Sequence, residues 1–317
     1  MSRGTKVWIA LGTIYVIWGS TYLGIELTGE TIPPLFGAAV RFLLAALLMA
    51  AIAAGRRGVG VFRVGRAELA SCALVGVLLP GANAMLFLAE RHVATGLSSL
   101  VIGSVPLWVV LLRFATGERP PAAALVGVGL GVGGLVLLVR PSGGAPLWAL
   151  LLVVASAVTW ATGAFLSGRL PLPADSFAAT ALEMLAGGLL LLPIALATTH
   201  PHFGAFSARS IGGFFYLVTF GSLIGYTAFV WLLDNAPIQR VATYAYVNPV
   251  VAIALGALVL HEPITWTIGL GAAVVLASVA IVVRRETVPA EAEGVTPDPR
   301  ALPGEPVRGG AASPSRP

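Results

Sequence analysis

Two ionisable side chains lie deep within apolar stretches of the sequence, Arg41 in the stretch 34–54 and Glu183 in the stretch 176–198. A charged group in the middle of a membrane costs at least ~2.5 kcal/mol, so each of them needs a partner or a purpose. Glu183 is therefore our candidate for ion coupling, in which a carboxylate binds and releases a proton. The alternative, which we favour, is that both side chains bond to backbone, hydroxyl groups or lipid headgroups.

Neutral polar and aromatic side chains within the apolar stretches form the predicted substrate-binding set. They are Trp18, Ser20, Tyr22, Asn83, Phe87, Trp160, Thr162, Tyr226, Tyr244 and Asn248. Such groups can bind zwitterionic or aromatic solutes without an ion pair. Hydrogen bonding between helices is the competing role for each of them. Trp18 and Trp160 either face a cavity or pack between helices.

Two prolines, Pro106 and Pro249, interrupt apolar stretches at matching positions. Each removes a backbone hydrogen bond and bends its helix, which leaves carbonyl groups that a cavity can use. We predict that they act as hinges, with a plain structural kink as the alternative.

Two carboxylates, Glu118 and Glu262, follow apolar stretches and precede a proline by one or two residues. As a pair they resemble catalytic acids. Each one, however, opens the next helix, where a carboxylate stabilises the N-terminal dipole and proline fits the first turn. We therefore expect both to cap the helices that follow them.

The sequence indicates no catalytic residue, metal site or cofactor. All four histidines, His92, His200, His202 and His261, fall in connections between apolar stretches, so an intramembrane serine has no histidine beside it. Gly129, Gly131 and Gly134 spell a nucleotide-binding fingerprint, but they lie in an uncharged stretch. The pairs Gly127–Gly131 and Gly129–Gly133 in this stretch have the four-residue spacing of close helix packing. That packing joins the two halves of the chain or two copies of it, so a monomer and a homodimer both stay open.

The composition identifies a membrane protein. Of 317 residues, 57% are hydrophobic and only 10% are charged, against roughly 25% charged in soluble domains. The mean hydropathy is +0.91. The net charge of +5 does not indicate a nucleic-acid partner, because the basic residues flank apolar runs instead of forming one water-facing patch. Membrane lipid is the expected surrounding partner.

With roughly 20 apolar residues needed for each crossing, we predict an all-α polytopic fold of ten spans. The spans are 7–26, 34–54, 68–89, 95–115, 122–140, 147–168, 176–198, 211–233, 241–260 and 266–284. Short connections such as Glu90-Arg91-His92 leave little room for extramembrane domains. The segment 285–317 is rich in proline, glycine and acidic residues, so we expect a disordered cytoplasmic tail.

Arginine and lysine predict the orientation, since they gather in cytoplasmic loops. With both termini in the cytoplasm, the inner side holds Arg3, Lys6, Arg56, Arg57, Arg63, Arg66, Arg113, Arg119, Arg169, Arg240, Arg284 and Arg285. The outer side holds only Arg91, Arg140 and Arg209. This asymmetry supports an even number of spans in a bacterial-type plasma membrane.

The chain repeats itself. A shift of 142 residues aligns Trp18 with Trp160 and Arg41 with Glu183. The segments around Pro106 and Pro249, and around Glu118 and Glu262, also correspond. Because five spans is an odd number, the second copy must be inverted in the membrane. The inversion separates the depths of Arg41 and Glu183 by roughly 10 Å, so we expect no direct ion pair.

Three segments make this sequence resemble the EamA branch of the drug/metabolite transporter superfamily. They are Ile14 to Ile25, Ala38 to Leu47, and Val241 to Glu262 running into Ile268-Gly269. The resemblance covers the repeats 7–140 and 147–284. It implies a ten-helix bundle with a central cavity lined mainly by spans 1, 3, 4, 6, 8 and 9. The predicted substrate-binding residues lie on these spans, whereas Arg41 and Glu183 lie on spans 2 and 7.

The family resemblance also implies the export or exchange of small metabolites. We therefore predict an alternating-access carrier, an exporter of small amphipathic compounds such as amino acids, with proton coupling as an open possibility. A membrane-embedded enzyme and a carrier of sugar phosphates or nucleotide sugars are the weaker alternatives, since the membrane-spanning stretches hold no acid pair and no cluster of cations.

Overall fold

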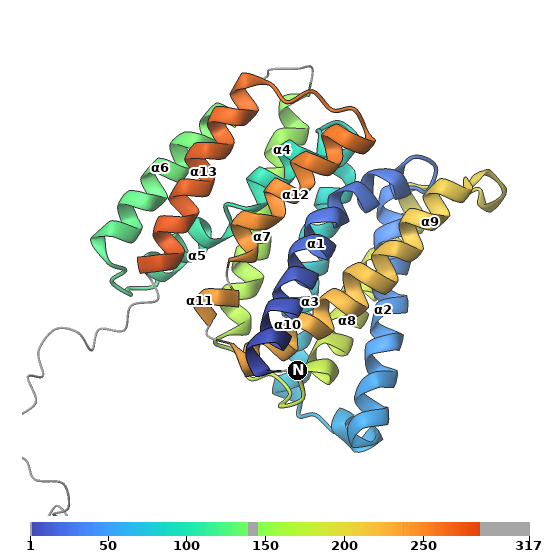
Figure 1. Cartoon of the computed structure of the whole chain (residues 1–317). Coiled ribbons are helices and arrows are strands. Elements are labelled where there is room, and N and C mark those ends of the chain that lie inside the picture. Colours follow the sequence, from blue (N-terminus) through green and yellow to red (C-terminus); the bar gives the residue numbers. More distant parts are fainter. Residues whose placement is uncertain (1, 139–144, 237, 242, 286–317) are drawn as a thin grey trace, which may run out of the picture. The chain divides into compact units, whose positions relative to one another are not determined.

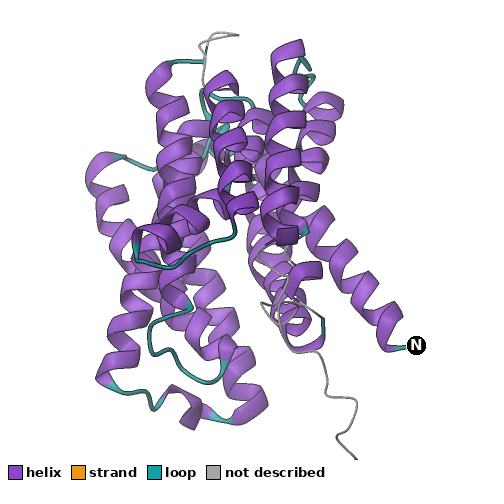
Figure 2. Ribbon diagram, turned by 90° about the vertical axis from the view of Figure 1, so that its left-hand side faces the viewer, coloured by secondary structure: helices purple, strands orange, loops and turns teal. Residues whose placement is uncertain are grey.

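A computed structural model describes residues 2–138, 145–236, 238–241 and 243–285. Within these ranges the chain is entirely helical, without strands (Figures 1 and 2). The helices of the first half are α1 Arg3–Gly29, α2 Pro34–Arg57, α3 Arg66–Glu90, α4 Thr95–Ile102, α5 Val105–Ala115 and α6 Ala122–Leu138. Those of the second half are α7 Leu147–Ser167, α8 Ser176–Thr198, α9 Ala208–Tyr216, α10 Gly225–Asn235, α11 Ile238–Val241, α12 Tyr244–Val259 and α13 Trp266–Arg285. Two 3₁₀ turns, Val59–Phe62 and Phe203–Ala205, lie in connections, and a π-helix, η3 Leu217–Ile224, joins α9 to α10.

Eight helical segments of the described chain are long and apolar enough to cross a membrane. Two shorter apolar helices, Ala122–Leu138 and Tyr244–Val259, accompany them. The all-helical membrane class predicted from composition is therefore confirmed. The predicted tail lies outside the described residues except for Arg285, as do the last two residues of the predicted span 122–140.

Two predicted spans are not regular α-helices. The span 95–115 breaks at Gly103 and Ser104, between α4 and α5, so Pro106 occupies the first turn of a new helix. The span 211–233 contains the π-helix η3, in which the backbone hydrogen-bond pattern widens for two turns. Pro249 lies inside α12. The helix continues on both sides of this proline, and the predicted bend at Pro249 stays a prediction.

The two halves pack through pairs of helices. Helix α2 packs most extensively on α8, α6 on α13, and α3 on α7. Helix α1 packs against α9, α10 and α12, so most of its neighbours belong to the second half of the chain. The side chains between these helices are small and apolar, and the core contains many fully buried alanines and valines. Close helix packing of this kind stabilises membrane bundles through van der Waals contact.

The glycines of α6 differ in how closely other residues approach them. A Cβ on Gly131 would collide with Leu107 and with the Ser278 hydroxyl of α13, so this position needs glycine for close approach. Gly129 meets nothing within 4 Å. The predicted packing between halves is thus present along the Gly127–Gly131 pair and continues at Gly134, whereas the Gly129–Gly133 pair makes no close contact.

Candidate functional site

Three aromatic rings meet where α1, α10 and α12 pack together. The Trp18 ring lies 5.1 Å from Phe229 and 5.2 Å from Tyr244, the second pair edge to face. Phe229 and Tyr244 are 6.0 Å apart, also edge to face. Such arrangements place the positive edge of one ring on the negative face of another. The sequence predicted Trp18 and Tyr244 as site residues, whereas Phe229 was missed because it is a simple apolar residue in an apolar stretch.

The π-helix η3 and the end of α9 supply polar partners to α1 next to this cluster. Trp18 Nε1 donates to the Gly221 carbonyl at 3.2 Å, which satisfies the indole N–H inside the bundle. The hydroxyls of Ser20 and Tyr216 share a hydrogen bond of 2.5 Å beside it. A π-helical turn is rare and commonly marks a functional site, since it shifts carbonyl groups out of the regular α pattern.

Arg41 reaches the same π-helix from α2. Its side chain is buried, and its Nε donates to Ser222 Oγ at 3.1 Å. Its Nη1 donates to Asn83 Oδ1 on α3 at 3.2 Å. The guanidinium carbon lies 5.3 Å from the ring centre of Phe42 and 5.9 Å from that of Phe87. As expected, Arg41 bonds to neutral groups and not to Glu183.

The Arg41 guanidinium is a buried cation that forms no ion pair with the acidic side chains of the described residues. Neutral hydrogen bonds and aromatic faces offset part of its desolvation cost. A buried charge without a counter-charge is expensive, often by several kcal/mol. The side chains around the Arg41 guanidinium, namely Asn83, Ser222 and Phe87, thus supply hydrogen-bond acceptors and an aromatic face but no counter-charge. Asn83 and Phe87 were predicted as site residues, while Ser222 was not.

The other predicted residues make contacts of a more structural kind. The Tyr226 hydroxyl hydrogen-bonds to Thr180 of α8. With its amide turned, the Asn248 nitrogen donates to the carbonyls of Tyr15 and Tyr244, each at 3.3 Å. Tyr22 and Phe87 are buried in the main apolar core. These residues link α1, α8, α10 and α12.

The predicted site residues of α7, Trp160 and Thr162, have no recorded contact with the aromatic cluster. Thr162 Oγ1 donates to the Val158 carbonyl of its own helix at 2.8 Å, and Trp160 is half-buried without a ring contact among the described residues. Glu183 is also half-buried, and its backbone lies directly against Gly76 of α3. The predicted roles of these three residues stay predictions.

A groove of about 490 Å³ lies between α1 and the segment formed by η3 and α10. Its lining is mainly apolar, with Lys6 at one side and Thr13, Thr227 and Trp231 along the wall. It shares α1 and α10 with the aromatic cluster, and η3 is the element whose Gly221 carbonyl accepts from Trp18. This groove therefore adjoins the candidate site.

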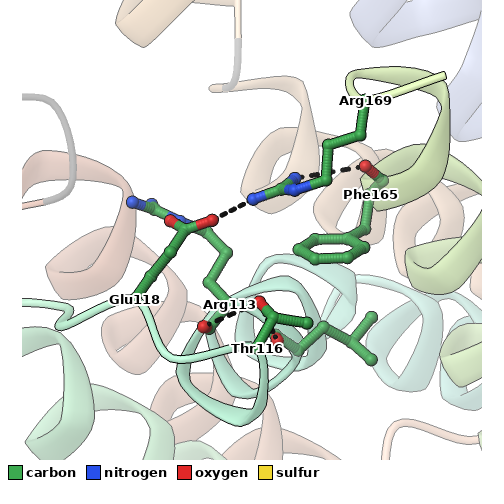
Figure 3. Close-up of polar contacts among 6 residues, drawn as sticks. Arg113, Thr116, Glu118, Phe165 and Arg169 are labelled. Carbon is green, nitrogen blue, oxygen red and sulfur yellow. Dashed lines mark hydrogen bonds and ion pairs between the residues drawn. The ribbon is translucent and has the colours of Figure 1, made fainter.

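Glu118 lies in an ionic network that joins the two halves (Figure 3). Its carboxylate accepts from Arg113 Nε at 2.6 Å and also pairs with Arg169, which follows α7. The Arg169 guanidinium stacks on the Phe165 ring at 3.7 Å. Hydrogen bonds from Arg113, and next those from Arg169, hold the pKa of Glu118 below its ordinary value. The expected cap on the following helix is wrong, because two arginines draw the carboxylate away.

Glu262 does cap a helix, but not the one that follows it. Its carboxylate accepts from the Thr95 backbone N–H at 2.8 Å, the Thr95 hydroxyl at 3.0 Å and the Gly96 N–H at 3.3 Å. These groups form the N-terminus of α4, where a negative charge is stabilised by the helix dipole. Glu262 therefore joins the second half of the chain to α4, the first part of the interrupted span 95–115. We call this contact the Glu262 clamp.

Comparison with known proteins decides the family. The sequence model of the EamA-like transporter family matches residues 6–140 and again residues 147–284. The chain belongs to the EamA-like transporter family. The resemblance stated from the three segments is thereby confirmed.

The EamA-family relatives are named as transporters. The uncharacterized inner membrane transporter YedA of Escherichia coli K12 is 35% identical over 257 residues, which cover 78% of this chain and 80% of that protein. An uncharacterized transporter of Archaeoglobus fulgidus is 26% identical over 88% of this chain and 99% of its own length. A solved crystal structure shares the fold with a TM-score of 0.61, at 21% identity over 88% of this chain and 96% of that chain.

Proposed function

We propose that this EamA-family protein is an alternating-access carrier that exports small amphipathic metabolites with a carboxylate, such as amino acids. The observation that carries the proposal is the buried Arg41, whose recorded partners in the described chain are neutral and aromatic. A carboxylate substrate supplies the missing negative charge through charge-assisted hydrogen bonds. The Trp18, Phe229 and Tyr244 rings nearby offer an apolar surface for the rest of the molecule.

A single guanidinium also limits the substrate class. Phosphate esters carry about two negative charges and are usually met by several cations or backbone amides. Arg41 is the one fully buried cation among the described residues. Carriage of sugar phosphates or nucleotide sugars is therefore disfavoured, and no enzyme is proposed because the relatives are named as transporters.

The packing pattern supports ten spans in two inverted repeats. Eight membrane-length segments and two shorter apolar helices together match the ten predicted stretches. If each helix is exchanged for its repeat mate, the pairs α2 with α8 and α6 with α13 map onto themselves. The contact of α3 with α7 likewise maps onto that of α1 with the α9–α10 segment. A two-fold axis in the membrane plane produces this pattern.

The proposed hinges lie against each other. A Cβ on Gly103, at the break between α4 and α5, would lie 3.0 Å from the Pro249 ring and 3.2 Å from the Ala245 carbonyl. The break that precedes Pro106 thus contacts Pro249 of the other half. Rocking of one half against the other requires flexible points where the halves touch, and this contact meets that requirement.

We place the protein in a bacterial-type inner membrane with both termini in the cytoplasm. The asymmetry of arginine and lysine supports this orientation, and the relative YedA is named as an inner membrane protein. The orientation puts the Glu118 network inside and Glu262 outside. Labelling of intact cells with an impermeant maleimide tests it, with Arg119→Cys and Thr267→Cys each made on a Cys72→Ala background. We expect labelling of the Thr267 position alone, and labelling of the Arg119 position would reverse the orientation.

The function is tested by comparing metabolites in the medium of cells with and without the protein. We expect amino acids or related amphipathic carboxylates to accumulate outside cells that produce it. An Arg41→Gln variant present at the same level in the membrane should abolish the difference. An unchanged medium, or one enriched only in phosphate esters, would contradict the proposal. Glu183 stays our sequence-based candidate for ion coupling, and gradient-driven transport unchanged in Glu183→Gln would eliminate that role.

A further inference from the structure

Glu90, the last residue of α3, is a buried carboxyl group without hydrogen bonds. It is only 3% exposed, and neither carboxylate oxygen has a partner among the residues that the structure describes. An ionised carboxylate in such surroundings has a desolvation cost far above that of the neutral acid. These surroundings favour the neutral, protonated form of Glu90 over the carboxylate. From the sequence we expected Glu90 in a short connection between two spans.

Within the described residues, the recorded electrostatic neighbours of Glu90 are two acidic side chains and a neutral hydroxyl, with no cation among them. Glu26 and Tyr22 face it from α1, and Glu262 faces it from the segment before α13. The neighbouring Arg91 turns instead toward the end of α1, where it donates to the Gly29 carbonyl at 3.4 Å. The His92 ring packs on Trp148 of α7 at 4.9 Å. Elements α2, α4, α7 and α8 bring no further recorded titratable partner to Glu90 within the described chain.

A bound metal ion does not explain this cluster. No group of three or more histidine, cysteine, aspartate or glutamate side chains in the described chain is arranged to hold a metal. Glu262 is already engaged with the N-terminus of α4 through both oxygens. A proton is the cation that a single carboxylate can bind without help from neighbouring ligands.

The cluster adjoins an opening large enough for water. A pocket of about 10 Å³ lies against Glu262, bordered by Gly96, Ile253 and Ile268. A volume of this size holds a single water molecule. Movement of the Glu262 side chain away from α4 would widen this pocket and admit water beside Glu262, which is an electrostatic neighbour of Glu90. Hydration removes the cost of ionising Glu90, so its O–H bond can break and the proton can pass to water.

We infer that Glu90 is a proton-binding site whose occupancy is linked to the closure of the bundle end formed by Glu26, Glu90 and Glu262. The inference rests on the proposed carrier function and assigns its energy coupling: a proton exchanges for substrate when this end opens. It places coupling at the end of α3, whereas sequence reasoning placed its candidate at Glu183.

The first test needs no substrate. Thermal unfolding of the purified full-length protein is followed from pH 5 to pH 9 for the wild type and for Glu90→Gln, which mimics the neutral acid. The wild type should lose thermal stability as the pH rises, because ionisation puts a charge in the buried cluster. Glu90→Gln should lose clearly less. Glu30→Gln is the matched control, since Glu30 is a carboxylate at the same end that is partly exposed and paired with Arg209 at 3.3 Å. Equal alkaline losses in all three proteins would overturn the inference.

The second test separates coupling from transport. Proteoliposomes with an internal pH dye receive a mixture of the common amino acids, and exchange of the same radiolabelled mixture is measured without a pH gradient. We expect substrate-induced proton movement in the wild type, Glu30→Gln and Glu183→Gln, and a signal at the level of empty vesicles for Glu90→Gln, which keeps exchange. Proton movement unchanged in Glu90→Gln would overturn the inference and leave the carrier function standing. Absence of exchange in the wild type would instead remove the carrier function for this substrate class.

Discussion

Glu118 and Glu262 occupy equivalent positions in the two halves of the chain but have opposite surroundings. Glu118 pairs with Arg113 and Arg169 in a partly exposed ionic network. Glu262 accepts three hydrogen bonds at the start of α4 and has Glu26 and Glu90 as electrostatic neighbours. They lie at opposite ends of the span formed by α4 and α5. Both residues fasten one half to the other, one through surface charge and one through a buried cap.

The Glu118 and Glu262 contacts, at opposite ends of the α4–α5 span, therefore differ in stability and in the change of conditions that would break them. An exposed ion pair contributes little and weakens with salt. A carboxylate that satisfies buried backbone N–H groups contributes more, because its loss leaves those donors without a partner. The Glu262 end should therefore open only when the cluster behind it changes its charge. The Glu118 end should respond mainly to ionic strength.

Gly256→Leu should produce the largest effect, since the new side chain would occupy the Glu262 clamp. A Cβ at this position would lie 2.7 Å from the Thr95 hydroxyl and closer still to the Glu262 carboxylate. Overpacking of this kind costs about 1–3 kcal/mol. The melting temperature in detergent should fall, whereas Gly269→Leu on α13, where nothing lies within 4 Å, should leave it nearly unchanged. Equal melting temperatures for both variants would refute the clamp.

Glu262→Ala should have the next largest effect. It removes the cap on Thr95 and Gly96, and loss of a helix cap costs about 0.5–2 kcal/mol. Glu262→Gln keeps one acceptor oxygen and should lose less. Melting temperatures of the three proteins at pH 7 measure this order. A Glu262→Gln variant less stable than Glu262→Ala would show that charge, and not hydrogen bonding, maintains the contact.

Glu118→Gln should have the smallest effect, and that effect should depend on pH. Because its arginine partners lower the pKa of Glu118 in the folded protein, their contribution is present above the unfolded pKa of about 4.3. It is lost as the pH falls through the lower folded value. The difference between wild type and variant should therefore exist at pH 7 and vanish under acid. Titration with salt at pH 7 should also remove it, and a difference that survives both treatments would contradict an exposed ion pair.

Hydropathy was sufficient to predict the membrane class and to place the helices within a few residues. The repeat identified Glu118 and Glu262 as a pair. It did not identify their partners, because those are set by tertiary packing: Glu262 and Thr95 are 167 positions apart. The same reason applies to Arg41 and Ser222, which are 181 positions apart.

Local departures from regular structure could not be predicted from the sequence either. The π-helix η3 lies in a stretch whose hydropathy is that of any spanning helix, although Gly221 and Gly225 are compatible with a widened turn. Phe229 looked like an ordinary core residue, and Glu90 like part of a hydrated loop. Burial decides the chemistry of both, and burial depends on which helices surround a position.

The central claim is that Arg41 binds the carboxylate of a transported solute, and uptake by proteoliposomes tests it most directly. Wild type, Arg41→Gln and the matched control Arg209→Gln, whose arginine is exposed and paired with Glu30, are supplied with radiolabelled amino acids and aromatic carboxylates. Wild type and control should take up at least one compound well above empty vesicles. Arg41→Gln should take it up about tenfold less, as expected for the loss of a charge-assisted hydrogen bond. Equal uptake by all three proteins, or no uptake above empty vesicles across the panel, would contradict the claim.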